Sequence, residues 1–278
     1  MIVNRLFTNP EPLGGDSIMT SLLTRGVILV GAAVAISGVP SAASAATVLF
    51  NLNSQSISTS GSGASAIKFT TATVGGVKVR ISAWSLSGTS GAGTISKSAI
   101  QQYSSGLGAV SAGESTSNNT HTIDNQYSRD FLLFQFDQSV SLLDAKLTPF
   151  AVGGSAKDTD FTVGRGTTGS PWTTQMNLTG VNSAGLMTLL SGGINNYNGP
   201  NVTSVQALNP SGGYGNVWIV GASFNNRGTI DAFKFSALRV ATALPVPESS
   251  TWMMMIVGIG AVGTTLRRKK SVAIVSAA

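Results

Sequence analysis

The stretch Val77–Ile81 reads VKVRI, an alternation of apolar and cationic residues. Successive side chains of a β-strand point to opposite faces of a sheet, so this alternation places the two valines and the isoleucine on one buried face. Short apolar runs rich in β-branched and aromatic residues recur along the chain without helical periodicity, and the glycine- and asparagine-rich segments 192–199 and 211–215 supply turns. The sequence therefore predicts an all-β fold, with an antiparallel β-sandwich body over residues 46–242.

The predicted strands of this body share β-branched or aromatic composition and a length of a few residues. They are Thr47–Leu52, Ile67–Ala72, Val77–Ser85, Phe131–Phe136, Val140–Leu143, Lys146–Val152, Phe161–Arg165, Val202–Leu208, Val217–Phe224 and Ile230–Val240. The serine- and glycine-rich segment Ser54–Ser65 is interpreted as a polar loop or edge within the body, with a flexible linker as the alternative.

Composition excludes several classes of function. The 278 residues include no cysteine and a single histidine, His121, which excludes a disulfide framework, a cysteine nucleophile and histidine-rich metal sites. Of the 17 basic residues, six lie in the terminal segments, and no basic stripe marks the body. Three acidic residues also lie in the terminal segments, so the body carries only +3 of the net charge of +6, and no nucleic-acid partner is predicted.

The N-terminal part, residues 1–45, is predicted to contain upstream sequence followed by a secretory signal peptide that starts at Met19. A short basic region with Arg25 precedes an apolar stretch, and small residues lead to an A-x-A site formed by Ala43 and Ala45. Cleavage between Ala45 and Ala46 by signal peptidase, after passage through the Sec translocon, would make Ala46 the new N-terminus. A retained membrane anchor is the alternative, but the apolar stretch is shorter than the roughly 20 residues that span a bilayer.

The C-terminal part, residues 243–278, begins with a linker and then combines an acidic motif, an apolar run and a basic cluster. Val246, Pro247 and Glu248 precede an uncharged run over residues 249–266 with Trp252 near its start. A helix of this length covers about 27 Å, close to the roughly 30 Å hydrocarbon core of a bilayer. A single transmembrane helix is predicted here, with its C-terminus held in the cytoplasm by four cations. This topology cluster consists of Arg267, Arg268, Lys269 and Lys270.

This tripartite end resembles the PEP-CTERM sorting signal of Gram-negative bacteria, in the version with a tryptophan after the motif. Ser249 departs from it, standing where a second proline is usual, and so does Met253, where alanine is usual. The resemblance implies recognition by an exosortase, an integral-membrane cysteine protease-transferase. It also implies a transient inner-membrane intermediate, delivery to the cell surface or extracellular matrix, and a link to exopolysaccharide and biofilm.

The body resembles a family of exosortase-dependent surface proteins of unassigned function, in which an H-x-I-D-N segment precedes D-F-L-L-F. The matching segments are His121–Asn125, Asp130–Phe134, Val77–Trp84, Asp158–Asp160, Trp218 and Ile230–Phe233. This resemblance implies a secreted sandwich and brings no known activity.

Candidate catalytic and metal-binding residues in the body each have a simpler structural interpretation. His121 with Asp124 and a serine could form a hydrolase triad, but no G-x-S-x-G elbow exists, so turn hydrogen bonds are the favoured interpretation. Asp158 and Asp160, with Asp124, Asp130 or Asp137, offer hard oxygen ligands for calcium, but an Asp-x-Asp pair alone is also typical of a solvated loop. No metal and no cofactor are therefore predicted, with Asp158 and Asp160 as the candidate ligands if calcium binds.

The tryptophans Trp84, Trp172 and Trp218 could stack on sugar rings, although core or rim positions are more usual in a sandwich. The sequence thus predicts a non-enzymatic, exported surface or matrix protein. The first alternative is a carbohydrate-binding module for exopolysaccharide. The second is a secreted hydrolase, which lacks a convincing constellation of acids and histidines.

Overall fold

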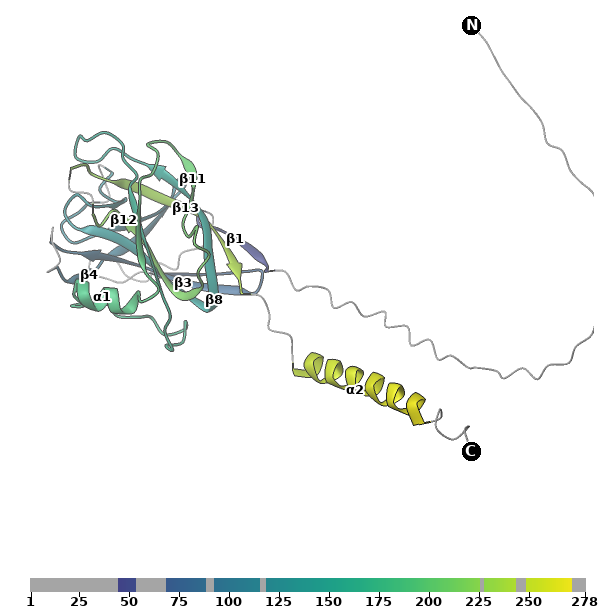
Figure 1. Cartoon of the computed structure of the whole chain (residues 1–278). Helices are drawn as coiled ribbons and strands as arrows, with labels where there is room; N and C mark the ends of the chain where they lie inside the picture. Colours follow the sequence, from purple (N-terminus) through teal and green to yellow (C-terminus); the bar gives the residue numbers. More distant parts are fainter. Residues whose placement is uncertain are drawn as a thin grey trace, which may run out of the picture. The chain divides into compact units, whose positions relative to one another are not determined.

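The computed structural model describes residues 45–53, 69–88, 93–115, 119–225, 228–243 and 249–271. Within these ranges the chain forms thirteen strands and two helices (Figure 1). Every pairing between the named strands is antiparallel. The body is mostly antiparallel β-strand, as the predicted all-β class requires, and α1 is the one helix that the structure describes within it.

The strands are β1 (Thr47–Asn51), β2 (Phe69–Val74), β3 (Val77–Leu86), β4 (Ile95–Lys97), β5 (Ala99–Tyr103), β6 (Gly106–Val110), β7 (Ile123–Asp124), β8 (Arg129–Pro149), β9 (Phe161–Gly166), β10 (Ile194–Tyr197), β11 (Ser204–Ala207), β12 (Gly215–Ala222) and β13 (Ala232–Thr242). The helices are α1 (Ser183–Leu189) and α2 (Ser249–Ser271).

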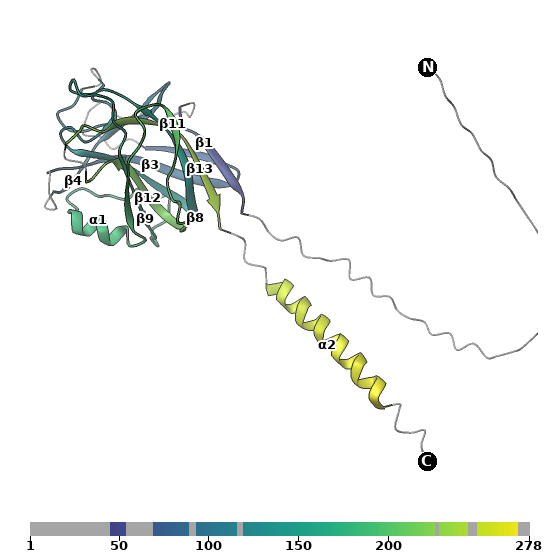
Figure 2. The same ribbon diagram turned by 45° about the horizontal axis from the view of Figure 1, so that its top comes forward.

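The long strand β8 organises the sheet, because its two halves have different neighbours. Its first half pairs with β3 on one side and with β12 on the other. Its second half pairs with β11 and β13. Figure 2 shows β8 beside β12 and β13. From one edge to the other, the main path runs β10-β9-β12-β8-β13-β6-β5.

Apolar residues of β8 alternate between two cores, as the twofold period of a strand requires. Leu132 and Phe134 belong to the larger core, to which the second half of β8 also contributes Leu142 and Leu147. Phe131 and Leu133 face the other way, into a smaller core that is closed by Trp84 and by Leu186 of α1. The first half of β8 is therefore buried on both faces, which explains its nearly continuous apolar sequence.

Several boundaries differ from those that the sequence predicts. The three segments predicted between Phe131 and Val152 belong to a single strand, which continues through the exposed polar residues 137–139 before ending at Pro149. β4, β5, β6, β7 and α1 were not predicted, and β10 lies inside the segment 192–199 that was interpreted as a turn. The segment Ser54–Ser65 lies outside the described residues.

The two ends of the body lie side by side. β1 pairs with the end of β13, with Thr47 opposite Ala241. The amide N–H of Thr242 donates to the carbonyl of Ala46 at 2.9 Å, and the amide N–H of Ala46 donates to the hydroxyl of Thr242 at 3.2 Å. The first and last strands of the body therefore close on each other directly after the predicted cleavage site.

The predicted C-terminal helix exists as α2, but its predicted role is not supported. Among the described helices, none is long and apolar enough to cross a membrane. The apolar residues of α2 are diluted by Gly258, Gly260 and Gly263 and by Thr264 and Thr265. The signal peptide with Ala43, and the motif Val246–Glu248, lie outside the described residues.

Candidate functional site

Acidic side chains gather in two clusters of the body. The first acidic cluster consists of Glu114, Asp124 and Asp130, and the second of Asp158, Asp160 and Asp231. Within each cluster, one carboxylate oxygen of every member lies within 4.8 Å of the others. Proximity of this kind is the minimum that a metal site needs, so the partners of each carboxylate decide what the cluster can do.

The first acidic cluster is assembled by three strands. Glu114 follows β6, Asp124 ends β7 and Asp130 is the second residue of β8. Asp124 and Asp130 are both 0% exposed. Because strand residues alternate between faces, Asp130 lies on the same face as Leu132 and points towards the larger core. The first acidic cluster thus lies where hydrophobic packing of the larger core ends.

Each carboxylate of the first acidic cluster accepts some hydrogen bonds. Glu114 Oε2 accepts from the amide N–H of Ser111 at 2.7 Å. Asp124 accepts from the amide N–H of Gln126 and from the hydroxyl of Thr122, both at 3.0 Å. The hydroxyl of Ser128 donates to Asp130 Oδ1 at 3.2 Å. Asp130 Oδ2 and Glu114 Oε1 are buried and have no hydrogen-bond partner among the described residues.

Burial dominates the electrostatics of this cluster. Burial, followed by the charge of Glu114, raises the pKa of Asp124 to about 7. Burial also raises the pKa of Asp130 well above its usual range, and the neighbouring charges of Glu114 and Asp124 add to this effect. Burial raises the pKa of Glu114, although hydrogen bonds from Ser111 oppose the change. No cation contributes to any of these pKa values, so the ionised forms are destabilised.

Carboxylates of the second acidic cluster accept hydrogen bonds from a backbone amide and from a side-chain amide. Asp160 Oδ1 accepts from the amide N–H of Gly199 at 3.1 Å. Asp231 Oδ2 accepts from the side-chain amide of Asn125 at 2.6 Å, and the Asp231 amide N–H donates to Asn125 Oδ1 at 2.9 Å. Since Asn125 directly follows Asp124, it joins the second acidic cluster to the first.

The predicted calcium candidates are only partly brought together. Asp158 and Asp160 share a cluster with Asp231, which the sequence interpretation missed. Asp124 and Asp130 belong instead to the first acidic cluster with Glu114. Asp137 belongs to neither, and its Oδ1 accepts from the amide N–H of Lys78 at 2.9 Å. Sequence spacing could not reveal Glu114 or Asp231, because strand pairing alone brings them to their clusters.

The histidine and aspartate of the hydrolase alternative do not form a catalytic pair. Asp124 makes the turn hydrogen bonds predicted for it, to Thr122 and Gln126, and does not bind the imidazole. His121 lies against the ring of Tyr103, with ring centroids 4.4 Å apart, and its Nδ1 has no hydrogen-bond partner among the described residues. Burial and the charge of Lys234 lower the pKa of His121. Among the described residues, therefore, no carboxylate orients the imidazole as a triad requires.

Two of the three tryptophans cannot form a sugar-binding platform. Trp84 is 0% exposed and Trp218 is 1% exposed, which confirms the core positions predicted as the usual ones and excludes stacking on an external ring. Trp172 is partly buried, and the ammonium of Lys78 lies 5.8 Å from its ring centroid.

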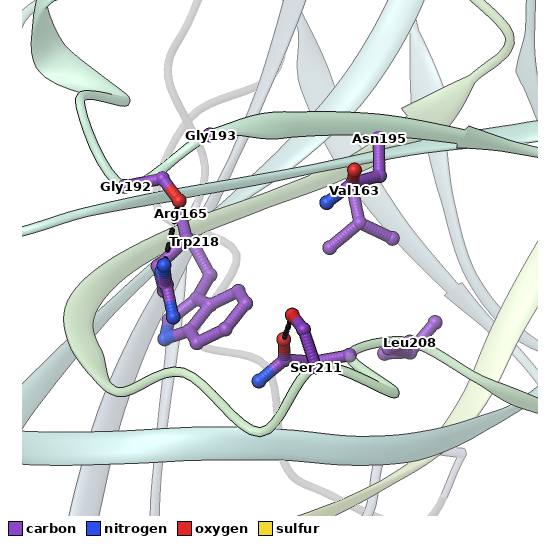
Figure 3. A pocket seen from close by; sticks show the side chains of 9 residues that line it. Val163, Arg165, Gly192, Gly193, Asn195, Leu208, Ser211 and Trp218 are labelled. Atoms are coloured by element: carbon purple, nitrogen blue, oxygen red, sulfur yellow. Dashed lines mark hydrogen bonds between the residues drawn. The ribbon is translucent and has the colours of Figure 1, made fainter.

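A small polar cleft lies at the β9–β10 edge of the sheet (Figure 3). Arg165 of β9 lies opposite Trp218 of β12 in the strand register, with its guanidinium carbon 6.0 Å from the ring centroid. Its Nη2 donates to the carbonyl of Gly192 at 2.7 Å. Asn195 and Asn209 add amides to the lining. The cleft has room for about one water molecule, so it can receive a small polar group but cannot enclose a larger ligand.

The four cations of the topology cluster lie in the last turns of α2. Trp252 lies in the first turn of the same helix.

Comparison with known proteins adds no assignment to any of these sites, since the chain matches no protein-family model, no curated protein and no solved structure.

Proposed function

We propose that this chain is an exported, non-enzymatic surface or extracellular-matrix protein that an exosortase sorts through its C-terminus. The body acts as a β-sandwich module, structural or adhesive, in a matrix of exopolysaccharide. Signal peptidase removes the N-terminal segment before Ala46, and the exosortase recognises Val246, Pro247, Glu248 and Trp252. The cations Arg267, Arg268, Lys269 and Lys270 keep the C-terminus cytoplasmic in the inner-membrane intermediate.

One observation carries this proposal: the paired strands β1 and β13 lie between the two predicted processing sites in the sequence. β1 begins at Thr47, the residue after Ala46, and β13 ends at Thr242, ahead of Val246. The same two strands pair with each other, so removal of both terminal segments leaves the closing strand pair of the body complete. A module that is trimmed at both ends during export needs this arrangement.

The burial of the body is consistent with a binding or structural module. The larger core receives residues from both halves of β8 and from β1, β3, β12 and β13. The residue pair of the hydrolase alternative does not meet, as described for His121 and Asp124. The shared core supports the proposal of a single structural or binding module.

The double substitution Pro247→Ala and Glu248→Ala tests the sorting step. Proline holds the chain extended and removes an amide donor, and Glu248 offers a carboxylate that a cationic pocket can select. We expect the double variant to accumulate in the inner membrane at precursor mass, whereas wild-type protein reaches the surface fraction at the mass of the doubly processed chain. Mass spectrometry of both fractions measures this outcome.

The matched control is Ser250→Ala with Thr251→Ala, which changes two adjacent residues between the motif and Trp252 and keeps the length. Normal processing of this control alongside a blocked Pro247/Glu248 variant assigns recognition to the motif. If the Pro247/Glu248 variant is processed like wild type, the segment is only a spacer and exosortase sorting is wrong.

The cleft around Arg165 favours a second candidate function, carbohydrate binding by the body. A guanidinium backed by the buried ring of Trp218 and flanked by Asn195 and Asn209 could hold an acidic or hydroxylated sugar unit. Binding of wild-type protein on a glycan array would separate this candidate from a purely structural role.

A further inference from the structure

The unpartnered oxygens of the first acidic cluster need an explanation that the sorting function does not supply. Asp130 is 0% exposed, and its Oδ2 has no hydrogen-bond partner among the described residues. Glu114 Oε1 is buried in the same way. A buried polar atom without a partner costs about 1–3 kcal/mol, and more when it is charged. Such an atom in a native protein calls for an explanation, and a bound ion is one explanation that a cluster of carboxylates suits.

Charge makes the cost larger, because no basic side chain of the described residues contributes to the pKa values of the three carboxylates. The ion pair found in the described part of the chain joins Arg239 to Asp144, which belongs to neither acidic cluster. The nearly buried Lys234 lies over the rings of Tyr103 and Phe150 instead. The carboxylates of the first acidic cluster must therefore be neutralised either by protons or by a bound cation.

We propose that Glu114, Asp124 and Asp130 bind a divalent cation of calcium chemistry at the end of the larger core. The donors are carboxylate oxygens, which hard cations prefer. The hydroxyls of Ser111 and Ser128, which lie 3.2 Å apart, extend the polar surface beside Asp130. Calcium tolerates irregular oxygen geometry, whereas magnesium demands a near-octahedral shell and retains several waters.

The second acidic cluster has the same number of carboxylates but lacks this signature. Asp160 and Asp231 accept hydrogen bonds from a backbone amide and from the amide of Asn125. None of its carboxylate oxygens is among the buried atoms without a partner. The geometry therefore assigns the cation to the first acidic cluster and not to the Asp-x-Asp pair.

Thermal unfolding of the purified full chain, stripped with EDTA and titrated with calcium chloride, tests this site. At calcium about 100-fold above the dissociation constant, the ratio of folded to unfolded chain should rise about 100-fold. A dissociation constant on the order of 10⁻⁴ M is expected, as in extracellular calcium modules. Magnesium chloride at equal concentration should stabilise the chain much less.

Asp130→Asn keeps the shape of the side chain and removes its charge, and should abolish the calcium response. Asp158→Asn is the matched control in the second acidic cluster and should retain it. If Asp130→Asn fails to fold, Glu114→Gln replaces it, because Glu114 is only partly buried. Circular dichroism verifies the fold of each variant.

Three results would overturn the assignment. An unchanged melting temperature of wild-type protein in calcium would mean that the carboxyls share protons instead. The calcium response could be lost in Asp158→Asn and kept in Asp130→Asn, which would move the site. Equal stabilisation by magnesium would exclude calcium chemistry.

Discussion

Each of the two acidic clusters brings three carboxylates within 4.8 Å of one another, yet their surroundings in the fold differ. Asp124 and Asp130 of the first are fully buried, and two oxygens of that cluster have no partner among the described residues. In the second, Asp158 and Asp160 are only partly buried, and a backbone amide and an asparagine hold Asp160 and Asp231. Proximity of carboxylates alone therefore does not define a metal site. The first acidic cluster differs in having buried carboxylate oxygens that lack a hydrogen-bond partner among the described residues.

Each cluster depends on a glycine that lets two backbone segments approach closely. A Cβ at Gly108 would lie 1.9 Å from the carbonyl oxygen of His121, and a Cβ at Gly199 would lie 2.3 Å from that of Thr159. Gly108→Ala must push β6 away from the segment that carries Asp124. We expect it to lower the free energy of unfolding by about 3 kcal/mol and to remove the calcium response. Urea unfolding with and without calcium measures both effects.

Gly199→Ala is the counterpart at the second acidic cluster, since the Gly199 amide N–H donates to Asp160. It should also destabilise the fold, by about 2 kcal/mol, but should keep the calcium response. A calcium response that survives Gly108→Ala and disappears in Gly199→Ala would reverse the assignment of the two clusters.

Asn125 connects the clusters, and its removal should affect stability less than the glycine substitutions. Asn125→Ala deletes the hydrogen bond to Asp231 Oδ2 and the acceptor for the Asp231 amide N–H. The expected loss in free energy of unfolding is about 2 kcal/mol, because Asp231 is buried and one of the bonds is charge-assisted. Chemical denaturation measures this loss.

Asn125→Asp is the informative control. It keeps an acceptor for the Asp231 amide N–H but places a second carboxylate beside Asp231 Oδ2, which the present amide donor approaches to 2.6 Å. It should therefore destabilise the chain more than alanine does. If aspartate is tolerated better than alanine, the link between the clusters is not electrostatic in the way described.

Much of the fold was predictable, because core strands carry their own periodicity. Val77–Ile81 and the aromatic run from Phe131 to Phe136 fill both faces of the central sheet, and both lie within strands as expected. β6 was missed because its sequence, GLGAV, is dominated by small residues, and Gly108 is there to admit the carbonyl of His121. β10 was missed because its asparagines resemble a turn while its backbone pairs with β9.

The candidate metal site was less predictable for a physical reason. Asp158 and Asp160 are recognisable by their local spacing, whereas Glu114 follows β6 and Asp124 and Asp130 lie in β7 and β8. β7 and β8 are brought together because both pair with β13, and that pairing is invisible in the spacing of the acids. The Asp-x-Asp motif therefore pointed to the second acidic cluster, whose carboxylates have hydrogen-bond partners. The first acidic cluster could be identified only from the burial of its carboxylates in the structure.

Lys234 gives the smallest expected effect. It is a buried cation that is not part of either acidic cluster, so its removal tests whether the first acidic cluster acts independently of it. It is 3% exposed, and its Nζ lies 3.5 Å from the ring centroid of Tyr103 and 4.7 Å from that of Phe150. Burial lowers the pKa of Lys234 from 10.5 to about 8. Between these two values the unfolded chain binds a proton that the folded chain does not. The free energy of unfolding should therefore rise with pH from about 8 to 10.

Lys234→Met keeps an unbranched apolar side chain against both rings and removes the charge. At pH 7, where lysine is charged in both states, it should raise the free energy of unfolding by no more than about 1 kcal/mol, because the buried charge is lost together with its contact to the rings. From pH 8 to 10 the stability of the variant should fall behind the rising stability of wild-type protein. Melting curves of both proteins at several pH values, compared as a difference, isolate this contribution.

The calcium response at pH 7 should be the same in both proteins. A weakened response in Lys234→Met would mean that this cation acts on the first acidic cluster after all, and that the separation between ring-bound charge and carboxylate site does not hold.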